Sequence, residues 1–116
     1  MSNQVKKLNT IVNRQDFLLA ARGKRSGQRS LLLQARDRRD GSSAIRIGLT
    51  CSKKLGNSVT RNKARRRLRE ISKSILMIIG LPGWDYVLVG RPKATVERPF
   101  LLLKKDLEVA IKRVHS

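Results

Sequence analysis

The amino-acid sequence predicts an α+β fold, with helices packed on a small mixed β-sheet in a single domain over residues 1–116. Two long segments, 58–79 and 97–114, repeat apolar residues every three or four positions, which is the period of a helix with one buried face. Shorter apolar runs bounded by turn residues have the length and composition of strands: residues 30–36, 44–51 and 84–90. With a short helix before them, the predicted order is α-β-β-α-β-α.

The first helix is predicted over roughly Arg14–Arg22. We interpret residues 1–10 as an irregular, flexible arm, because they contain little apolar surface. Asn13 can cap the helix, with Asp16 as its capping-box partner, and Gly23 suits the left-handed position that ends it. The basic segment GKRSGQR follows, and it either contacts a phosphate backbone or simply connects helix to strand.

The first two strands are predicted to form a hairpin. Residues 30–36 contain three consecutive leucines, and residues 44–51 alternate well enough for a strand. The polar turn DRRDGSS joins them, and Asp40 with Gly41 marks its tip. The two strands are therefore expected to pair directly with each other.

The longest helix comes next and carries the densest charge. Ser58 or Thr60 can cap its first turn, and its buried stripe is predicted from apolar spacing: Ala64, Leu68, Ile71, Ile75 and Ile78. Rotation by about 100° per residue places Asn62 and five cations along one arc beside this stripe: Arg61, Arg65, Arg66, Arg69 and Lys73. Lys63 and Arg67 extend the basic surface, and only Glu70 interrupts it. Because like charges at this spacing repel, we expect a polyanion as the counter-charge; a solvated basic face is the alternative.

The last third of the chain supplies a strand and a helix. Gly80, Pro82 and Gly83 break the helical period, and the run WDYVLVG then reads as a buried strand. The helix over 97–114 closes the chain, with Pro99 acceptable in its first turn.

Composition favours nucleic acid as the partner. The chain has 27 Lys and Arg against 8 Asp and Glu, a formal net charge of +19, and binding a phosphate backbone relieves that repulsion. No apolar run is long enough to span a membrane, no secretory signal is recognisable, and a single cysteine, Cys51, fits the reduced cytoplasm. His115 is the only histidine, so zinc or Cys–His chemistry lacks ligands, and a frayed terminal residue is expected there.

The centre of the chain carries a recognisable motif. The run SKKLGNSV, followed on the helix by Arg61-Asn62, Arg65-Arg66 and Arg69-Glu70, closely resembles the signature of the bacterial ribonuclease P protein subunit. The flanks agree with it: Asp16-Phe17, the glycine-basic segment Gly23 to Arg25, and Gly90-Arg91-Pro92. The likeness covers almost the whole chain.

The resemblance implies a subunit of a ribonucleoprotein endonuclease that removes the 5′ leader from precursor tRNA. Ribonuclease P RNA would perform the chemistry with Mg²⁺, so no catalytic residue, cofactor or metal site is expected on the protein itself. The resemblance also implies a left-handed βαβ crossover, against the right-handed rule for such units. The periodicity of the sequence alone does not predict that handedness.

The resemblance also assigns roles to residues. The helix motif and its approach would face the catalytic RNA, where arginine forks can bind phosphate oxygens in a bidentate manner. These predicted RNA-binding residues are Lys53, Lys54, Asn57, Arg61, Asn62, Arg65, Arg66 and Arg69.

A cleft for the single-stranded leader is implied as well. Phe17 would line it and stack on bases, although a core phenylalanine is an equally good interpretation. Ala21 and Gln34 stand where relatives often carry aromatic residues. We therefore expect leader recognition to depend more on charge, from the helix arginines and from Arg22, Lys24 and Arg29, than on stacking.

Three other kinds of protein share some of these features. A structural RNA-binding protein of the ribosomal type, without precursor preference, would share the charge and the fold. A self-contained nuclease usually needs clustered carboxylates, and the eight acids here are scattered. A DNA-binding helix-turn-helix protein is a poor match, because a strand and not a helix precedes the basic helix.

Overall fold

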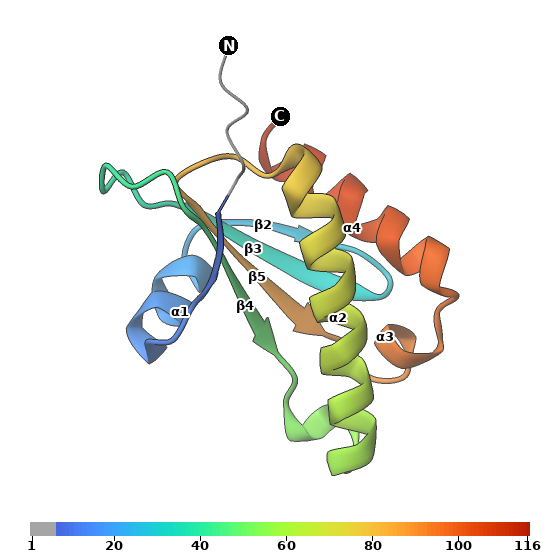
Figure 1. The fold of residues 1–116 in the computed structure, drawn as a ribbon. Coiled ribbons are helices and arrows are strands. Elements are labelled where there is room, and N and C mark those ends of the chain that lie inside the picture. Colours follow the sequence, from blue (N-terminus) through green and yellow to red (C-terminus); the bar gives the residue numbers. More distant parts are fainter. Residues whose placement is uncertain (1–6) are drawn as a thin grey trace.

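A five-stranded mixed sheet forms the centre of the computed structural model, which describes residues 7–116 (Figure 1). Its strand order is β1 (Leu8–Thr10), β4 (Ile45–Thr50), β5 (Trp84–Gly90), β3 (Leu31–Asp37) and β2 (Lys24–Gly27). The helices are α1 (Arg14–Ala21), α2 (Ser58–Ile79), α3 (Ala94–Glu97) and α4 (Phe100–Val114), and a 3₁₀ helix, η1 (Lys53–Leu55), precedes α2. The predicted α+β class with a small mixed sheet is confirmed.

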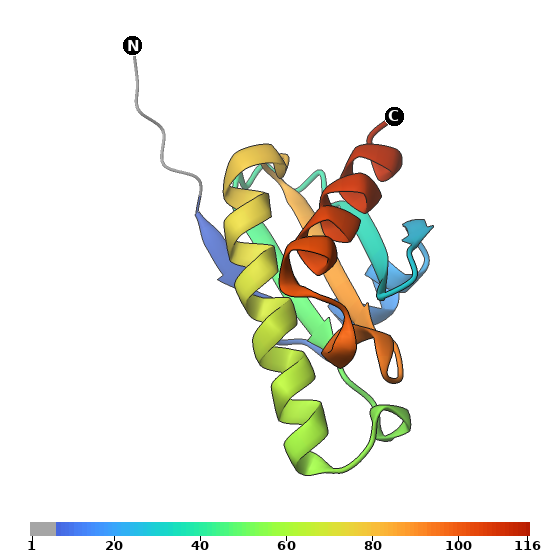
Figure 2. The same ribbon diagram turned by 90° about the vertical axis from the view of Figure 1, so that its right-hand side faces the viewer.

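The two faces of the sheet are covered differently. Helices α2 and α4 lie side by side over one face, and α1 lies on the other (Figures 1 and 2). The main core fills the space beneath α2 and α4, with fully buried Leu68, Leu107 and Tyr86 among its members. Beneath α1 the apolar cluster is much smaller. The α1 face is therefore left partly open.

Helix α2 connects two parallel neighbours, β4 and β5, so the three elements form a βαβ unit. In Figure 2 the helices lie in front of the sheet, both strands run downward, and β5 lies to the right of β4. That arrangement is a left-handed crossover, the exception to the usual rule. The handedness agrees with the expectation drawn from the family resemblance.

The predicted hairpin between the first two strands is wrong. Strand β5 lies between β3 and β4, antiparallel to the first and parallel to the second. The reason is burial: five of the seven residues of β5 are buried, so this strand gains most from having a neighbour on both edges. The segment between β3 and β4 consequently crosses the end of β5 instead of making a tight turn.

Two further strands lie where none was predicted. Leu8–Thr10, assigned to the flexible arm, pairs in parallel with β4, while residues 1–6 of that arm fall outside the described residues. Lys24–Gly27, in the basic segment, pairs antiparallel with β3 and buries Ser26. Both strands are short and polar, so their sequences carry little strand signal.

The helix ends also differ from the prediction. Asn57, and neither Ser58 nor Thr60, caps α2, with its Oδ1 accepting from the N–H of Thr60 at 2.9 Å. Asn13 makes no side-chain cap. The closing helix is split, because Pro99 disfavours helical backbone at the residue before it.

One predicted core position is also displaced. Ile78 is 71% exposed, whereas Leu76 is fully buried in its place. The buried stripe of α2 therefore shifts around the helix axis near the C-terminal end.

The last histidine is not frayed. Its Nε2 lies 2.7 Å from the hydroxyl of Tyr86, and its ring packs edge-on against Trp84. The Tyr86 hydroxyl also accepts from the N–H of Leu81, and the tautomer of the imidazole decides which group donates between Tyr86 and His115. Burial, together with the charge of Lys24, lowers the pKa of His115.

This contact predicts a pH dependence of stability. A histidine whose folded pKa is lowered stabilises the fold while it is neutral, and that stabilisation is lost as the pH falls below its ordinary value. We expect the free energy of unfolding to fall between pH 7 and 5.5, by at most about 1.4 kcal/mol per pH unit. Urea titrations of the wild type and of His115→Gln measure it, since no other histidine is present. An equally steep fall in the variant contradicts the assignment.

Candidate nucleic-acid interface

The basic arc of α2 faces away from the core. Asn62, Arg66 and Arg69 are exposed and Arg61 and Arg65 are half-buried, while the Nη1 of Arg65 donates to Oδ1 of Asn62 at 3.1 Å. In the described part of the chain, no cation of this arc forms an ion pair with a carboxylate. The arc therefore presents uncompensated positive charge, as the helical period predicts.

Arg67 does not belong to that surface. Its Nε donates to the carbonyl of Thr95 at 3.0 Å, its Nη2 donates to the carbonyl of Arg98, and its guanidinium lies 5.8 Å from the ring centre of Phe100. These carbonyls lie at the C-terminal end of α3, where a cation is favourable. Arg67 thus joins α2 to α3, and the expectation that it extends the basic surface is wrong.

The turn before α2 is tightly organised. The Oγ of Ser52 accepts from the N–H of Lys54 at 3.3 Å, and Gly56 has φ +130°, a conformation that a side chain would strain. Lys53 and Lys54 are left exposed beside the N-terminus of α2. Asn57 uses its side-chain oxygen as the cap, so only its amide nitrogen is free to donate to a ligand.

A cleft of about 340 Å³ lies between α2 and the β1–β4 edge of the sheet; we call it the edge cleft. One wall is the inner side of the basic arc, and the other is β1 with the segment that follows it. Around the strand edge the lining reaches α1. The lining residues are Leu8, Asn9, Thr10, Ile11, Phe17, Ile47, Gly48, Leu49, Arg65, Arg69, Ser72 and Lys73. The structure thereby brings Phe17 and two predicted RNA-binding arginines to one cavity.

Phe17 is half-buried and serves two purposes. Its ring lies directly against Gly48, where a Cβ would come within 2.6 Å of the ring, so a side chain at this position would displace Phe17. It also packs with Ile11, Ala20 and Val87 beneath α1. Part of the ring is therefore core, and the remainder lines the edge cleft.

The other predicted leader-binding residues are dispersed. Lys24 points to the opposite face of the sheet, with its Nζ 5.9 Å from the ring centre of Trp84. Arg22 lies on the outer side of α1 with Arg14, and Arg29 is exposed between β2 and β3. The structure therefore does not bring Lys24 together with Phe17.

The two positions where aromatic residues are missing are both half-buried. Gln34 lies opposite Val87 and Arg25 in the sheet, and Ala21 ends α1. Neither provides a flat ring on which a base could stack.

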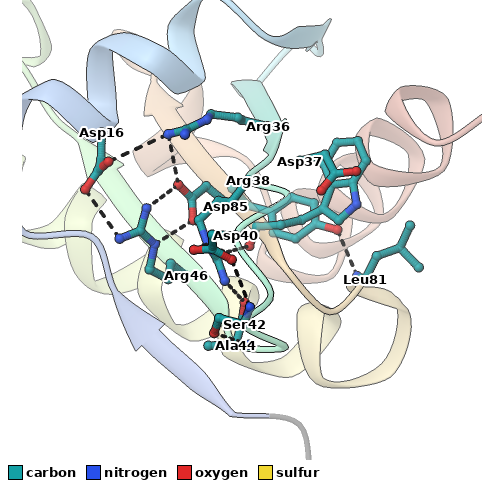
Figure 3. A network of polar contacts seen from close by, with 12 residues as sticks. Asp16, Arg36, Asp37, Arg38, Asp40, Ser42, Ala44, Arg46, Leu81 and Asp85 are labelled. Atoms are coloured by element: carbon teal, nitrogen blue, oxygen red, sulfur yellow. Dashed lines mark hydrogen bonds and ion pairs between the residues drawn. The ribbon is translucent and has the colours of Figure 1, made fainter.

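A buried carboxylate organises the open face, and the sequence interpretation missed it. Asp85 has no exposed surface and lies at the centre of the ion-pair network in Figure 3. Arg46 contacts it through two nitrogens at 2.7 Å each, and Arg38 contacts it at 2.8 Å. Arg46 also pairs with Asp16 of α1 at 3.3 Å. A lone Asp within an apolar strand is a signal that could have revealed this network, because a buried carboxylate requires cationic partners.

The network fixes both the crossing segment and α1. Arg38, nearly buried, also donates to the carbonyls of Ala44 and Trp84. Its hydrogen bond to Asp40 lowers the pKa of that carboxyl. Asp16, predicted as a capping-box residue, instead pairs with Arg46 and Arg36, which anchors α1 to the sheet.

Other chemistry finds little support among residues 7–116. No group of three or more His, Cys, Asp or Glu residues there could hold a metal ion. Cys51 is buried, and burial raises the pKa of its thiol, which disfavours a reactive thiolate. No helix in this part of the chain is long and apolar enough to cross a membrane.

Comparison with known proteins gives a consistent result. Residues 5–115 match the family model described as Ribonuclease P. The chain is 50% identical over 110 residues to the ribonuclease P protein component of Ruegeria pomeroyi, covering 94% of this chain and 88% of that protein. It is 44% identical over 112 residues to the component of Paramagnetospirillum magneticum, covering 93% and 84%.

Solved structures show the same similarity. The RNase P protein of Staphylococcus aureus superimposes with a TM-score of 0.73 at 28% identity, covering 90% of this chain and 93% of that one. The RNase P protein of Thermotoga maritima gives a TM-score of 0.71 at 28% identity, covering 86% and 91%.

Proposed function

The chain belongs to the ribonuclease P protein family, and we propose that it is the protein subunit of a ribonucleoprotein that matures the 5′ end of tRNA. In this proposal it binds ribonuclease P RNA and holds the 5′ leader of precursor tRNA. The RNA subunit carries out the hydrolysis with Mg²⁺, and the protein contributes no catalytic residue. The assembly would act in the cytoplasm.

The observation that carries the proposal is the uncompensated arc on α2. When exposed cations bind phosphates, counterions that were condensed on the nucleic acid are released. This release supplies most of the affinity for a nucleic-acid backbone. Arg66, which is exposed and lies outside the edge cleft, would contact ribonuclease P RNA, as would the exposed Lys53 and Lys54 that precede α2.

The edge cleft supports a route for the leader. Arg65 and Arg69 form one of its walls and Phe17 forms part of the other, so a single strand leaving the α2 surface would pass between charge and one aromatic ring. Because Ala21 and Gln34 offer no stacking surface, charge supplies most of the leader affinity. Arg22 and Arg29 would contact the strand farther along, whereas Lys24 faces away.

A structural RNA-binding role is the second candidate, since it needs the same basic arc. The two are separated by comparing the affinity of the complex with ribonuclease P RNA for precursor tRNA and for mature tRNA. The proposed function predicts tighter binding of the precursor than of the mature form, and this preference should depend on the protein. Equal affinities would favour the structural role.

Phe17→Ala tests the relative weight of charge and stacking. We expect the affinity of the assembled complex for precursor tRNA to fall less than tenfold, at the low end of the roughly 1–3 kcal/mol that a full base stack contributes, because part of the ring is buried in the core and only the remainder can stack. Equilibrium binding of precursor tRNA measures the change, with mature tRNA as the control ligand. A loss of tenfold or more would show that stacking dominates.

A further inference from the structure

Strand β1 places a hydroxyl group inside the edge cleft. Thr10 lies opposite Ile47 in parallel register, and neighbouring residues in register point to the same face of a sheet. Ile47 packs into the core beneath α2, so Thr10 lies on the α2 side. Its side chain is exposed and has no hydrogen-bond partner within residues 7–116.

The strand edge beside Thr10 is also uncovered. The N–H of Ile45 donates to the carbonyl of Lys7, and the N–H of Ile11 donates to the carbonyl of Ile47, after which the chain turns away into α1. Leu49 is the next residue of β4 that faces this edge. Within the described chain its main-chain N–H and carbonyl have no partner on that side.

The opposite wall of the cleft is cationic. Arg65, Arg69 and Lys73 line it, and no carboxylate is among the lining residues. Ser72 does not compete as a ligand, because its hydroxyl is buried and donates to the carbonyl of Arg69 at 2.8 Å. The cleft thus has positive charge on one side and neutral donors and acceptors on the other.

This pairing fits one unit of a ribonucleotide chain. A phosphate would bind the cations, and the ribose attached to it would then face Thr10. A hydroxyl side chain both donates and accepts, as the 2′-hydroxyl does, and that group is what distinguishes RNA from DNA at a protein site. The volume of about 340 Å³ suits one small ligand unit, and the cleft cannot admit a duplex.

We propose that the edge cleft binds a ribonucleotide of the single-stranded leader and that Thr10 recognises its 2′-hydroxyl. The inference rests on the proposed function, because it takes the leader as the strand that reaches the cleft. The leader is favoured over the catalytic RNA because the cleft continues to Phe17 on the α1 face, away from the exposed side of α2. Thr10 is then a specificity residue. It lies in a segment that the sequence predicts to be a flexible arm.

The test combines two substrates and two variants in the complex with ribonuclease P RNA. Precursor tRNA carries either an all-ribose leader or one with 2′-deoxyribose, and a 2′-fluoro leader serves as a second probe that keeps the ribose-like sugar shape. Thr10→Val removes the hydroxyl while preserving shape and β-branching, and Thr10→Ser retains the hydroxyl. Equilibrium dissociation constants are measured for each combination, with mature tRNA as reference.

The wild type and Thr10→Ser are expected to bind the 2′-deoxy leader about fivefold more weakly than the ribose leader, the size of one hydrogen bond. Thr10→Val should bind the ribose leader about fivefold more weakly than the wild type does and should not distinguish the two leaders. The 2′-fluoro leader should behave like the deoxy leader.

If the wild type and Thr10→Val show the same ratio of affinities for the ribose and 2′-deoxy leaders, the proposal is overturned, because the Thr10 hydroxyl would then have no part in recognising the 2′-hydroxyl. A Thr10→Val variant weakened only in assembly with ribonuclease P RNA would also overturn it, by assigning the cleft to the catalytic RNA. If the wild-type complex fails to prefer precursor over mature tRNA, the proposed function itself is wrong, and this inference falls with it.

Discussion

Replacing Arg61 and Arg66, the two arginines of the arc that lie outside the edge cleft, together by alanine is expected to lower the affinity for ribonuclease P RNA about 100-fold near physiological salt. Each arginine supplies one phosphate contact of about 1–2 kcal/mol. The slope of log affinity against log salt should become shallower by about one unit for each lost contact. Filter binding or fluorescence titration over a range of salt concentrations measures both quantities.

Two controls separate phosphate binding from general charge. Lys105→Ala with Arg113→Ala removes the same charge from exposed positions of α4, and we expect little change in affinity. Arg67→Ala removes a charge from α2 itself, but its partners are carbonyls of Thr95 and Arg98, so it should lower stability without changing the salt slope. An unchanged slope in the Arg61 and Arg66 variant would reject their assignment to phosphate.

Asp85→Asn is expected to lower the free energy of unfolding by about 3 kcal/mol, a large fraction of the stability of a small domain. The substitution removes the negative charge that compensates Arg38 and Arg46. The side chain of Arg38 is only 3% exposed, so water cannot replace this compensation. Urea denaturation followed through the fluorescence of Trp84, the only tryptophan and the neighbour of Asp85, measures the loss.

Asp37→Asn is the matched control for that substitution. Asp37 pairs with Arg39, whose side chain is 87% exposed, and exposed pairs contribute little. The control should therefore lie within about 0.5 kcal/mol of the wild type. A value for Asp85→Asn equally close to the wild type would show that the network does not stabilise the fold.

The fold class could be predicted because long periodic segments specify it. Helix α2 and strand β5 both lie where their patterns place them, within one or two residues. Strand pairing could not be predicted in the same way. The polar turn between β3 and β4 favours a local hairpin of these two strands. The burial of β5 instead requires β5 to lie between β3 and β4, and this effect depends on the packing of the whole chain and not on local sequence.

The candidate site divides along similar lines. Which α2 residues point outward follows from the helical period, so the arc could be predicted residue by residue. The position of Lys24 could not, because it depends on an edge strand with almost no sequence signal. Nor could the position of Thr10 in the cleft, which depends on three residues of parallel pairing.

If this chain supports cleavage by a catalytic RNA, cleavage of precursor tRNA should depend on both components. Precursor-tRNA cleavage is measured at low Mg²⁺ with bacterial ribonuclease P RNA alone, with this protein alone, and with the two together. Accurate 5′ cleavage is expected only from the combination. A combination no more active than the RNA alone would contradict it and favour a structural RNA-binding role, and cleavage by the protein alone would contradict the assignment of catalysis to RNA.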